Sequence, residues 1–134
     1  MKHLPTIARY LLGLIFFVFG LNGFLQFLPQ PELGPDAGAF LGALAATGYM
    51  FPMLKILETL AGLALLTNRF VPLSLVVLAP ITVNIVAFHA ALDPAGIAVG
   101  LLAFLLNLYL LFAYKKYFDP ILTTKAELNS EDSE

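Results

Sequence analysis

Four long apolar stretches dominate the chain, and proline, glycine or charged residues bound each of them. The first covers residues 6–28, and its part from 10 to 28 contains no charged side chain. The others cover residues 51–67, 70–92 and 95–117. A helix needs about 20 mostly apolar residues to cross the hydrocarbon core of a bilayer. The pattern therefore predicts four transmembrane helices.

A cleaved signal peptide is the rival interpretation of the first stretch, because Lys2 and Arg9 precede it. The apolar core of a signal peptide is only about 7–15 residues long, and a cleavage site of small residues follows it. Here the run is longer, and no such site follows it. We expect the first stretch to remain as a transmembrane helix.

The segment between the first two stretches predicts a different kind of element. Three prolines and a glycine in residues 29–36 interrupt the helix. Residues 37–47 then form a short helix, with Asp36 near its N-cap and Gly48 just past its end. At about 1.5 Å per residue this helix is too short to span a bilayer. We expect a re-entrant or interfacial helix, or the packed start of the next span. Within the third stretch, Pro80 predicts a kink.

Composition supports a membrane protein. Apolar residues make up 60% of the chain and charged residues 12%, whereas a soluble domain has about 45–50% and about 25%. We predict an all-α fold, an integral membrane four-helix bundle over residues 1–117 with the lipid bilayer as its surroundings. Residues 118–134 are polar and acidic, and predict a disordered cytoplasmic tail.

The positions of the basic residues predict the orientation, because Lys and Arg near the ends of spans favour the cytoplasmic side. With four spans, one side of the membrane receives Lys2, Arg9, Arg69, Lys115, Lys116 and Lys125. The opposite connections, residues 29–50 and 93–94, contain no Lys or Arg. Both termini are therefore expected in the cytoplasm. A fifth span over residues 37–47 would move Arg69 to the opposite side and break this pattern.

Several kinds of chemistry are excluded by residue counts. The chain has no cysteine, so disulfides, thiolate nucleophiles and cysteine-bound metal centres are ruled out. Two histidines, His3 and His89, do not suffice for a multi-histidine metal site within one span. No basic patch suggests nucleic acid as a partner. The sequence predicts no metal site and identifies no catalytic residue.

Polar residues inside the spans are the candidates for function, because such groups are costly in lipid and usually face the bundle interior. Nearly all of them fall in the non-cytoplasmic half of the membrane, and Asn107, near the middle of the fourth span, is the exception. They predict a polar pocket in that half, lined by Asn22, Gln26, Lys55, Glu58, Asn84 and His89.

A purely structural role is the alternative for each residue. Lys55 and Glu58, three residues apart, form an ion pair in either case. Asparagines within spans commonly hydrogen-bond between helices. His89 is expected near the membrane surface, where water can solvate a histidine that has no functional role. Because Asn84 and His89 are five residues apart on a helix, both cannot point at one centre.

Three segments resemble the DoxX-like family of small four-helix bacterial membrane proteins. They are R-x-x-L-G-L-I-F-x-x-x-G-L-N-G-F at residues 9–24, P-M-L-K-I-L-E-T-L-A-G-L-A-L-L at 52–66 and N-R-F-V-P-L-S-L-V-V-L-A-P-I-T-V-N-I at 68–85. The resemblance covers roughly residues 7–117. It implies four helices in the bacterial cytoplasmic (inner) membrane and a link to respiratory or redox systems, including quinone-coupled ones. It carries over no catalytic residue, and Lys55 and Glu58 are the positions to which a family site would map.

Three functions stay open from the sequence. The first is a redox- or respiration-associated subunit that binds quinone or another small molecule without a covalent bond. At most it is a non-catalytic or partner-dependent subunit of a quinone-linked oxidoreductase, so a membrane or redox protein partner is expected. The second is a structural or assembly protein without chemistry, and the third is a small transporter component. A homo-oligomer also stays open.

Overall fold

The computed structural model describes residues 2–129. The chain forms five α-helices: α1 (Leu4–Leu25), α2 (Pro35–Ala46), α3 (Met50–Leu66), α4 (Val71–Leu92) and α5 (Ile97–Ala113). Short 3-10 helices are η1 (Pro94–Gly96), η2 (Lys115–Tyr117) and η3 (Asp119–Leu122). Since the described residues contain no strand, the predicted all-α class is confirmed.

Several helices are long and apolar enough to cross a membrane. Three segments meet this requirement of length and apolar character by themselves: α1, α4, and the continuous segment Pro94–Ala113 that joins η1 to α5. The helices α2 and α3 meet it only as a pair, and they are bent by 93° at the break between them. The structure thus has three helices that could cross a membrane, or four if α2 and α3 supply one more, which suggests a multi-pass membrane protein.

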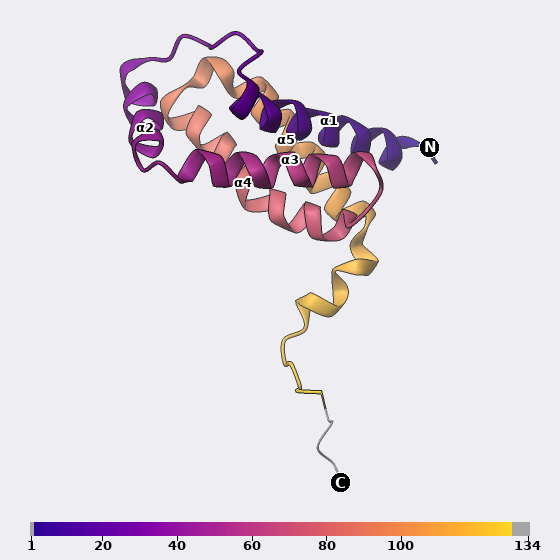
Figure 1. The fold of residues 1–134 in the computed structure, drawn as a ribbon. Helices are drawn as coiled ribbons and strands as arrows, with labels where there is room; N and C mark the ends of the chain where they lie inside the picture. The colour runs from indigo at the N-terminus through magenta and orange to yellow at the C-terminus, as the bar shows by residue number, and fades with distance from the viewer. Residues whose placement is uncertain (1, 130–134) are drawn as a thin grey trace.

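Figure 1 shows α1, α3, α4 and α5 running side by side, with α2 lying across one end. The helix α1 contacts α3 and α5, and α4 contacts the same two helices. The start of α1, the α3–α4 turn and the end of α5 meet at one end, which we call the basic end. The opposite end, where α2 lies and where α4 turns into α5, we call the α2 end.

The α1–α3 contact is close because glycines face each other across it. A Cβ atom added at Gly62 would lie 2.8 Å from the Cα of Phe17 and 2.8 Å from the carbonyl oxygen of Gly13. A Cβ at Gly13 would lie 3.0 Å from the Cβ of Leu65. Small residues allow helix backbones to approach closely, which is how helices gain van der Waals contact in lipid. These glycines hold α1 and α3 in register.

The tightest packing lies in the half of the protein nearest the basic end. The fully buried leucines all belong to this half: Leu12, Leu65, Leu75, Leu78 and Leu110. Phe118, just beyond the predicted last span, is also buried against this core. The packed region therefore extends past residue 117 to Phe118, whereas the residues of η3 are exposed. The predicted disordered tail stays a prediction, and its residues 130–134 lie outside the described range.

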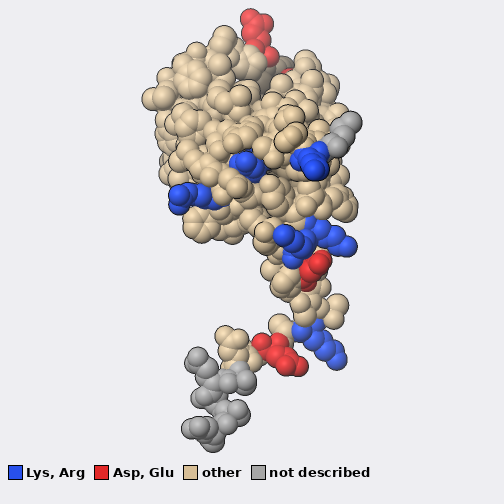
Figure 2. Space-filling model, turned by 90° about the vertical axis from the view of Figure 1, so that its right-hand side faces the viewer, with Lys and Arg blue, Asp and Glu red and all other residues tan. Residues whose placement is uncertain are grey.

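Basic side chains gather at the basic end, which faces the viewer in Figure 2. This end carries residues from the start of α1, from the α3–α4 turn and from η2: Lys2, Arg9, Arg69, Lys115 and Lys116. Of the described acidic residues, Glu32, Asp36 and Asp93 lie near the α2 end, whereas Asp119 and Glu127 follow α5 beyond the basic end. The basic residues of the bundle thus gather at one end, as their positions along the sequence predicted.

Helix boundaries differ from the predicted ones by a few residues. Helix α1 ends at Leu25, because Gln26 adopts the left-handed conformation with φ 50°. Helix α2 has Gly34 as its N-cap, so Asp36 lies in the first turn instead of at the cap. Gly48 has φ +75° in the break before α3. Helix α4 is continuous through Pro80.

Candidate functional site

Lys55 and Glu58 form the one predicted pair that the structure brings into direct contact. Both lie on α3, and the Nζ of Lys55 donates a hydrogen bond to the Oε2 of Glu58 at 2.9 Å. Glu58 is only 4% exposed, whereas the Lys55 side chain is 23% exposed. A carboxylate in such a place needs a charged or hydrogen-bonding partner. Lys55 supplies that partner from the preceding turn of the same helix.

Helix α1 makes room for this pair with two glycines. A Cβ atom at Gly23 would lie 2.6 Å from the Cδ of Lys55. One at Gly20 would lie 2.7 Å from the backbone nitrogen of Thr59, whose hydroxyl donates to the carbonyl of Lys55 at 2.7 Å. The lysine stem therefore lies directly on the α1 backbone, which directs the ammonium group toward Glu58.

Asn22 and Gln26 terminate α1. The backbone N–H of Gln26 bonds the carbonyl of Asn22, and the side-chain oxygen of Asn22 accepts a hydrogen bond from the N–H of Leu28 at 2.8 Å. Gln26 is exposed. These contacts satisfy backbone groups that the helix end would otherwise leave unpaired. The Asn22 side-chain oxygen is therefore occupied by the chain itself.

Asn84 shares no hydrogen bond with the other candidates among residues 2–129. Its side chain is exposed on α4, and among residues 2–129 its amide group has no hydrogen-bond partner. Glu58, by contrast, is buried.

His89 pairs with Asp93 where α4 ends. The Nδ1 of His89 lies 3.1 Å from the carbonyl oxygen and 3.2 Å from the Oδ2 of Asp93. A Cβ at Gly96, in η1, would lie 2.7 Å from the Cε1 of His89. The imidazole is thus held between the end of α4 and the turn into α5, at the rim of the α2 end.

The hydrogen bonds of the six candidates fall into separate groups. They comprise the Lys55–Glu58 pair, the Asn22 cap and the His89–Asp93 contact. The Asn22 and His89 contacts lie near the α2 end, and the Lys55–Glu58 pair lies between the middle of α3 and that end. A single pocket shared by the six stays a prediction.

Two further polar contacts tie helices together nearer the basic end. Buried Arg9 donates to the backbone carbonyl of Leu65 and so joins α1 to α3. Buried Asn107 donates to the carbonyl of Leu75 at 3.2 Å and so joins α5 to α4. The position of Arg9 near the start of an apolar run indicated only an orientation signal, because a flanking arginine and a buried one look alike in sequence.

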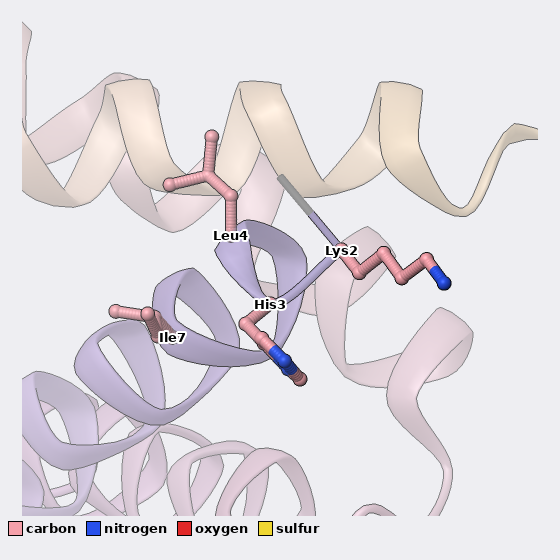
Figure 3. Close-up of a pocket in the computed structure, with 4 residues that line it drawn as sticks. All are labelled: Lys2, His3, Leu4 and Ile7. Carbon is pink, nitrogen blue, oxygen red and sulfur yellow. The ribbon is translucent and has the colours of Figure 1, made fainter.

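An open depression lies at the basic end, far along the chain from the candidates above. Its lining residues come from the start of α1: Lys2, His3, Leu4 and Ile7. In Figure 3 the Lys2 and His3 side chains point away from Leu4 and Ile7 instead of converging on a common centre. This depression is not the predicted polar pocket, and its side chains do not form a binding constellation.

The described part of the chain contains no group of three or more His, Asp or Glu side chains arranged to hold a metal ion. Comparison of the chain with protein-family models, with curated proteins and with solved structures finds no match.

Proposed function

We propose that the chain is a DoxX-like subunit of a redox or respiratory system in the bacterial inner membrane. In this proposal it binds quinone or another small molecule through a polar pocket in the half nearest the α2 end. Lys55 and Glu58 are the central groups of that pocket. The resemblance of residues 7–117 to the family and the chemistry of this pair support the proposal.

The proposed architecture is a bundle of four spans, α1, α3, α4 and α5. At about 1.5 Å per residue, the 17 residues of α3 extend about 26 Å, slightly less than the hydrocarbon thickness. It runs antiparallel to α1, with Lys55 at Gly23 and Leu65 at Gly13. A helix in this position crosses the same depth as α1. In the proposed arrangement α2 then lies at the membrane surface or re-enters it.

The proposed orientation puts the basic end in the cytoplasm, together with both termini. It rests on the gathering of Lys and Arg at that end (Figure 2) and on the preference of such residues for the cytoplasmic side. The Lys55–Glu58 pair then lies in the outer half of the bilayer.

One observation carries the functional proposal: a lysine and a buried glutamate form an ion pair inside an otherwise apolar helix. Ionisable residues at membrane depth are costly and commonly mark a ligand or proton pathway. The Lys55 ammonium can donate a hydrogen bond to a carbonyl oxygen, such as that of a quinone. Glu58 can accept or release a proton beside it. Because the chain has no cysteine, electrons have to come from a partner protein.

The test is to purify the protein in mild detergent and measure co-extracted quinone by mass spectrometry. Wild type is compared with Glu58→Gln and Lys55→Met. Asn107→Leu is the matched control, because it removes a buried polar contact between α4 and α5. We expect quinone enriched in wild type and Asn107→Leu, and lost in the two pocket variants. Equal quinone in all four proteins, or none above an unrelated membrane protein, would contradict the proposal.

A structural or assembly role is the second candidate, and one contact favours it. Lys55 and Glu58 satisfy each other, and the Lys55 stem packs on Gly23, so the pair also fixes α3 against α1. In that case both single variants lose stability and no ligand is lost. The quinone content separates the two roles, and thermal unfolding of the same variants shows whether a loss of quinone merely accompanies a loss of stability.

A further inference from the structure

The chain continues past α5 in a segment, residues 114–122, that contains the 3-10 helices η2 and η3. This segment leaves the bundle at the basic end, crosswise to the long helices (Figure 1), and a view along the bundle shows the same departure (Figure 2). With the long helices across the bilayer, as proposed above, a crosswise direction is parallel to the membrane plane. The segment then lies at the depth of the lipid headgroups.

One face of this segment is apolar. The backbone N–H groups of Ile121 and Leu122 both donate to the carbonyl of Phe118, at 3.1 and 3.2 Å, so these three residues share a helical face. Phe118 is buried against the bundle core, which directs this face toward the bundle. Ile121 and Leu122 are nevertheless 65% and 70% exposed, because the segment has passed the edge of the bundle (Figure 1). In a bilayer, their side of the segment is directed at the lipid beside the bundle.

The start of the segment combines lysine and tyrosine side chains. The Nζ of Lys116 lies 5.0 Å from the centroid of the Tyr117 ring, and the Tyr114 and Tyr117 ring centroids are 6.4 Å apart. Lys115 and Lys116 are exposed, and among residues 2–129 they form no ion pair, not even with the nearby Asp119. Tyrosine is enriched at the membrane–water boundary, and lysines there are attracted to anionic headgroups.

We propose that residues 114–122 dock onto an anionic lipid surface at the basic end. Ile121 and Leu122 insert at the boundary between headgroups and acyl chains, and the two lysines contact headgroup phosphates. The apolar side chains anchor the segment by leaving water, and the lysines favour an anionic surface by charge complementarity. Few contacts suffice, because α5 already holds the segment beside the surface. The proposal rests on the four-span arrangement and not on the quinone ligand.

A single introduced tryptophan tests the docking, because the chain has none of its own. The full-length variants are Ile121→Trp, Leu128→Trp as the matched control from the exposed tail beyond the segment, and Leu105→Trp from the lipid-facing side of α5. Each is reconstituted into vesicles of phosphatidylcholine and phosphatidylglycerol whose acyl chains carry bromine, a contact quencher. We expect Ile121→Trp to be quenched by bromine near the headgroups and Leu105→Trp by bromine near the chain centre, with Leu128→Trp unquenched.

Replacing both lysines by glutamine in the Ile121→Trp chain tests the role of charge. Each loss should lower the ratio of docked to free segment roughly fivefold in vesicles with phosphatidylglycerol, with little change in phosphatidylcholine alone. Equal quenching with and without the lysines would overturn the choice of an anionic surface.

The other outcomes separate the docking from its alternatives. An Ile121→Trp emission as water-exposed as that of Leu128→Trp would overturn the proposal. So would a short-wavelength emission without quenching by lipid, which indicates a protein partner or a second copy. An unquenched Leu105→Trp would refute the four-span arrangement and the docking with it. A quenched Ile121→Trp in a chain that binds no quinone would support the docking and count only against the ligand.

Discussion

At the scale of single residues, the Lys55–Glu58 pair is the least expected feature of an apolar helix. Glu58 is almost fully buried, and its partner comes from one turn away on α3, with no other helix contributing a charge to the contact. Removing one member of such a pair leaves a charge without its partner, whereas replacing both leaves none. The two kinds of replacement therefore have different consequences for stability.

We expect Lys55→Met to lower the free energy of unfolding by about 3 kcal/mol or more, because Glu58 then loses its cation. The double variant Lys55→Met with Glu58→Gln should return to within about 1 kcal/mol of wild type. Thermal or denaturant unfolding in detergent measures both. A double variant as unstable as the sum of the singles would show that the two residues act independently.

The glycines of the α1–α3 contact give a second prediction. A Cβ at Gly62 would meet the backbone of Phe17 and of Gly13, so Gly62→Ala should cost about 1–3 kcal/mol through overpacking. Gly42→Ala on α2 is the control, since a Cβ there meets no atom within 4 Å. The melting temperatures of the two variants are compared in the same detergent. If Gly62→Ala melts no lower than Gly42→Ala, the close approach of α1 and α3 is wrong.

At the scale of elements, the break between α2 and α3 decides how α2 lies. The two helices meet at 93° within the short segment that contains Gly48. Gly48 has φ +75°, a conformation that residues with a Cβ adopt only at a cost. Across the bend, Phe40 of α2 packs on Phe88 of α4, with ring centroids 5.7 Å apart. This turn and the aromatic contact together hold α2 against the bundle end.

Gly48→Ala should therefore loosen the turn, with a cost of about 1–2 kcal/mol from backbone strain alone. No atom lies within 4 Å of a Cβ at this position, so crowding does not contribute. Gly38→Ala, inside α2 with equally open surroundings, is the matched control. Limited proteolysis of the segment between α2 and α3 measures the effect. Identical cleavage rates for the two variants would argue against a strained turn.

At the scale of the whole molecule, opposite ends of the bundle differ in charge. The basic end carries Lys and Arg from three separate parts of the chain, and the α2 end carries Glu32, Asp36 and Asp93. Such a difference directs insertion only if the ends lie on opposite sides of the membrane. The topology is therefore the property on which the four-span proposal depends most.

Cysteine labelling of intact cells tests this topology. With four spans we expect Glu32→Cys and Ala95→Cys to react with a membrane-impermeant reagent, and Asn68→Cys to react only after permeabilisation. The chain without cysteine provides the unlabelled background. Labelling of Asn68→Cys in intact cells would place the α3–α4 turn outside, which excludes the proposed orientation.

Much of the architecture follows from local sequence. The four apolar stretches and the proline-rich break predicted helices α1, α3, α4 and α5 to within a few residues. Their spacing in the sequence predicted that Lys55 and Glu58 are neighbours, because residues three apart share a helix face. The predicted end of α1 was three residues late. That end depends on the Asn22 side chain reaching the N–H of Leu28, which apolar periodicity does not reveal.

The sequence alone determined that this is an all-helical, strongly apolar chain with its basic residues at one end. Segment length, composition and the positions of charges predict these features without any knowledge of which distant segments contact each other. Only the tertiary structure decided which polar groups are paired inside and which face outward. Glu58 and Asn107 are buried, with Lys55 and the carbonyl of Leu75 as their partners, while Asn84 is exposed. Which face of a helix meets a neighbour depends on contacts between distant segments, such as Gly13 with Gly62. A nearly uniform apolar helix carries little sequence signal for that choice, since both its faces are compatible with lipid.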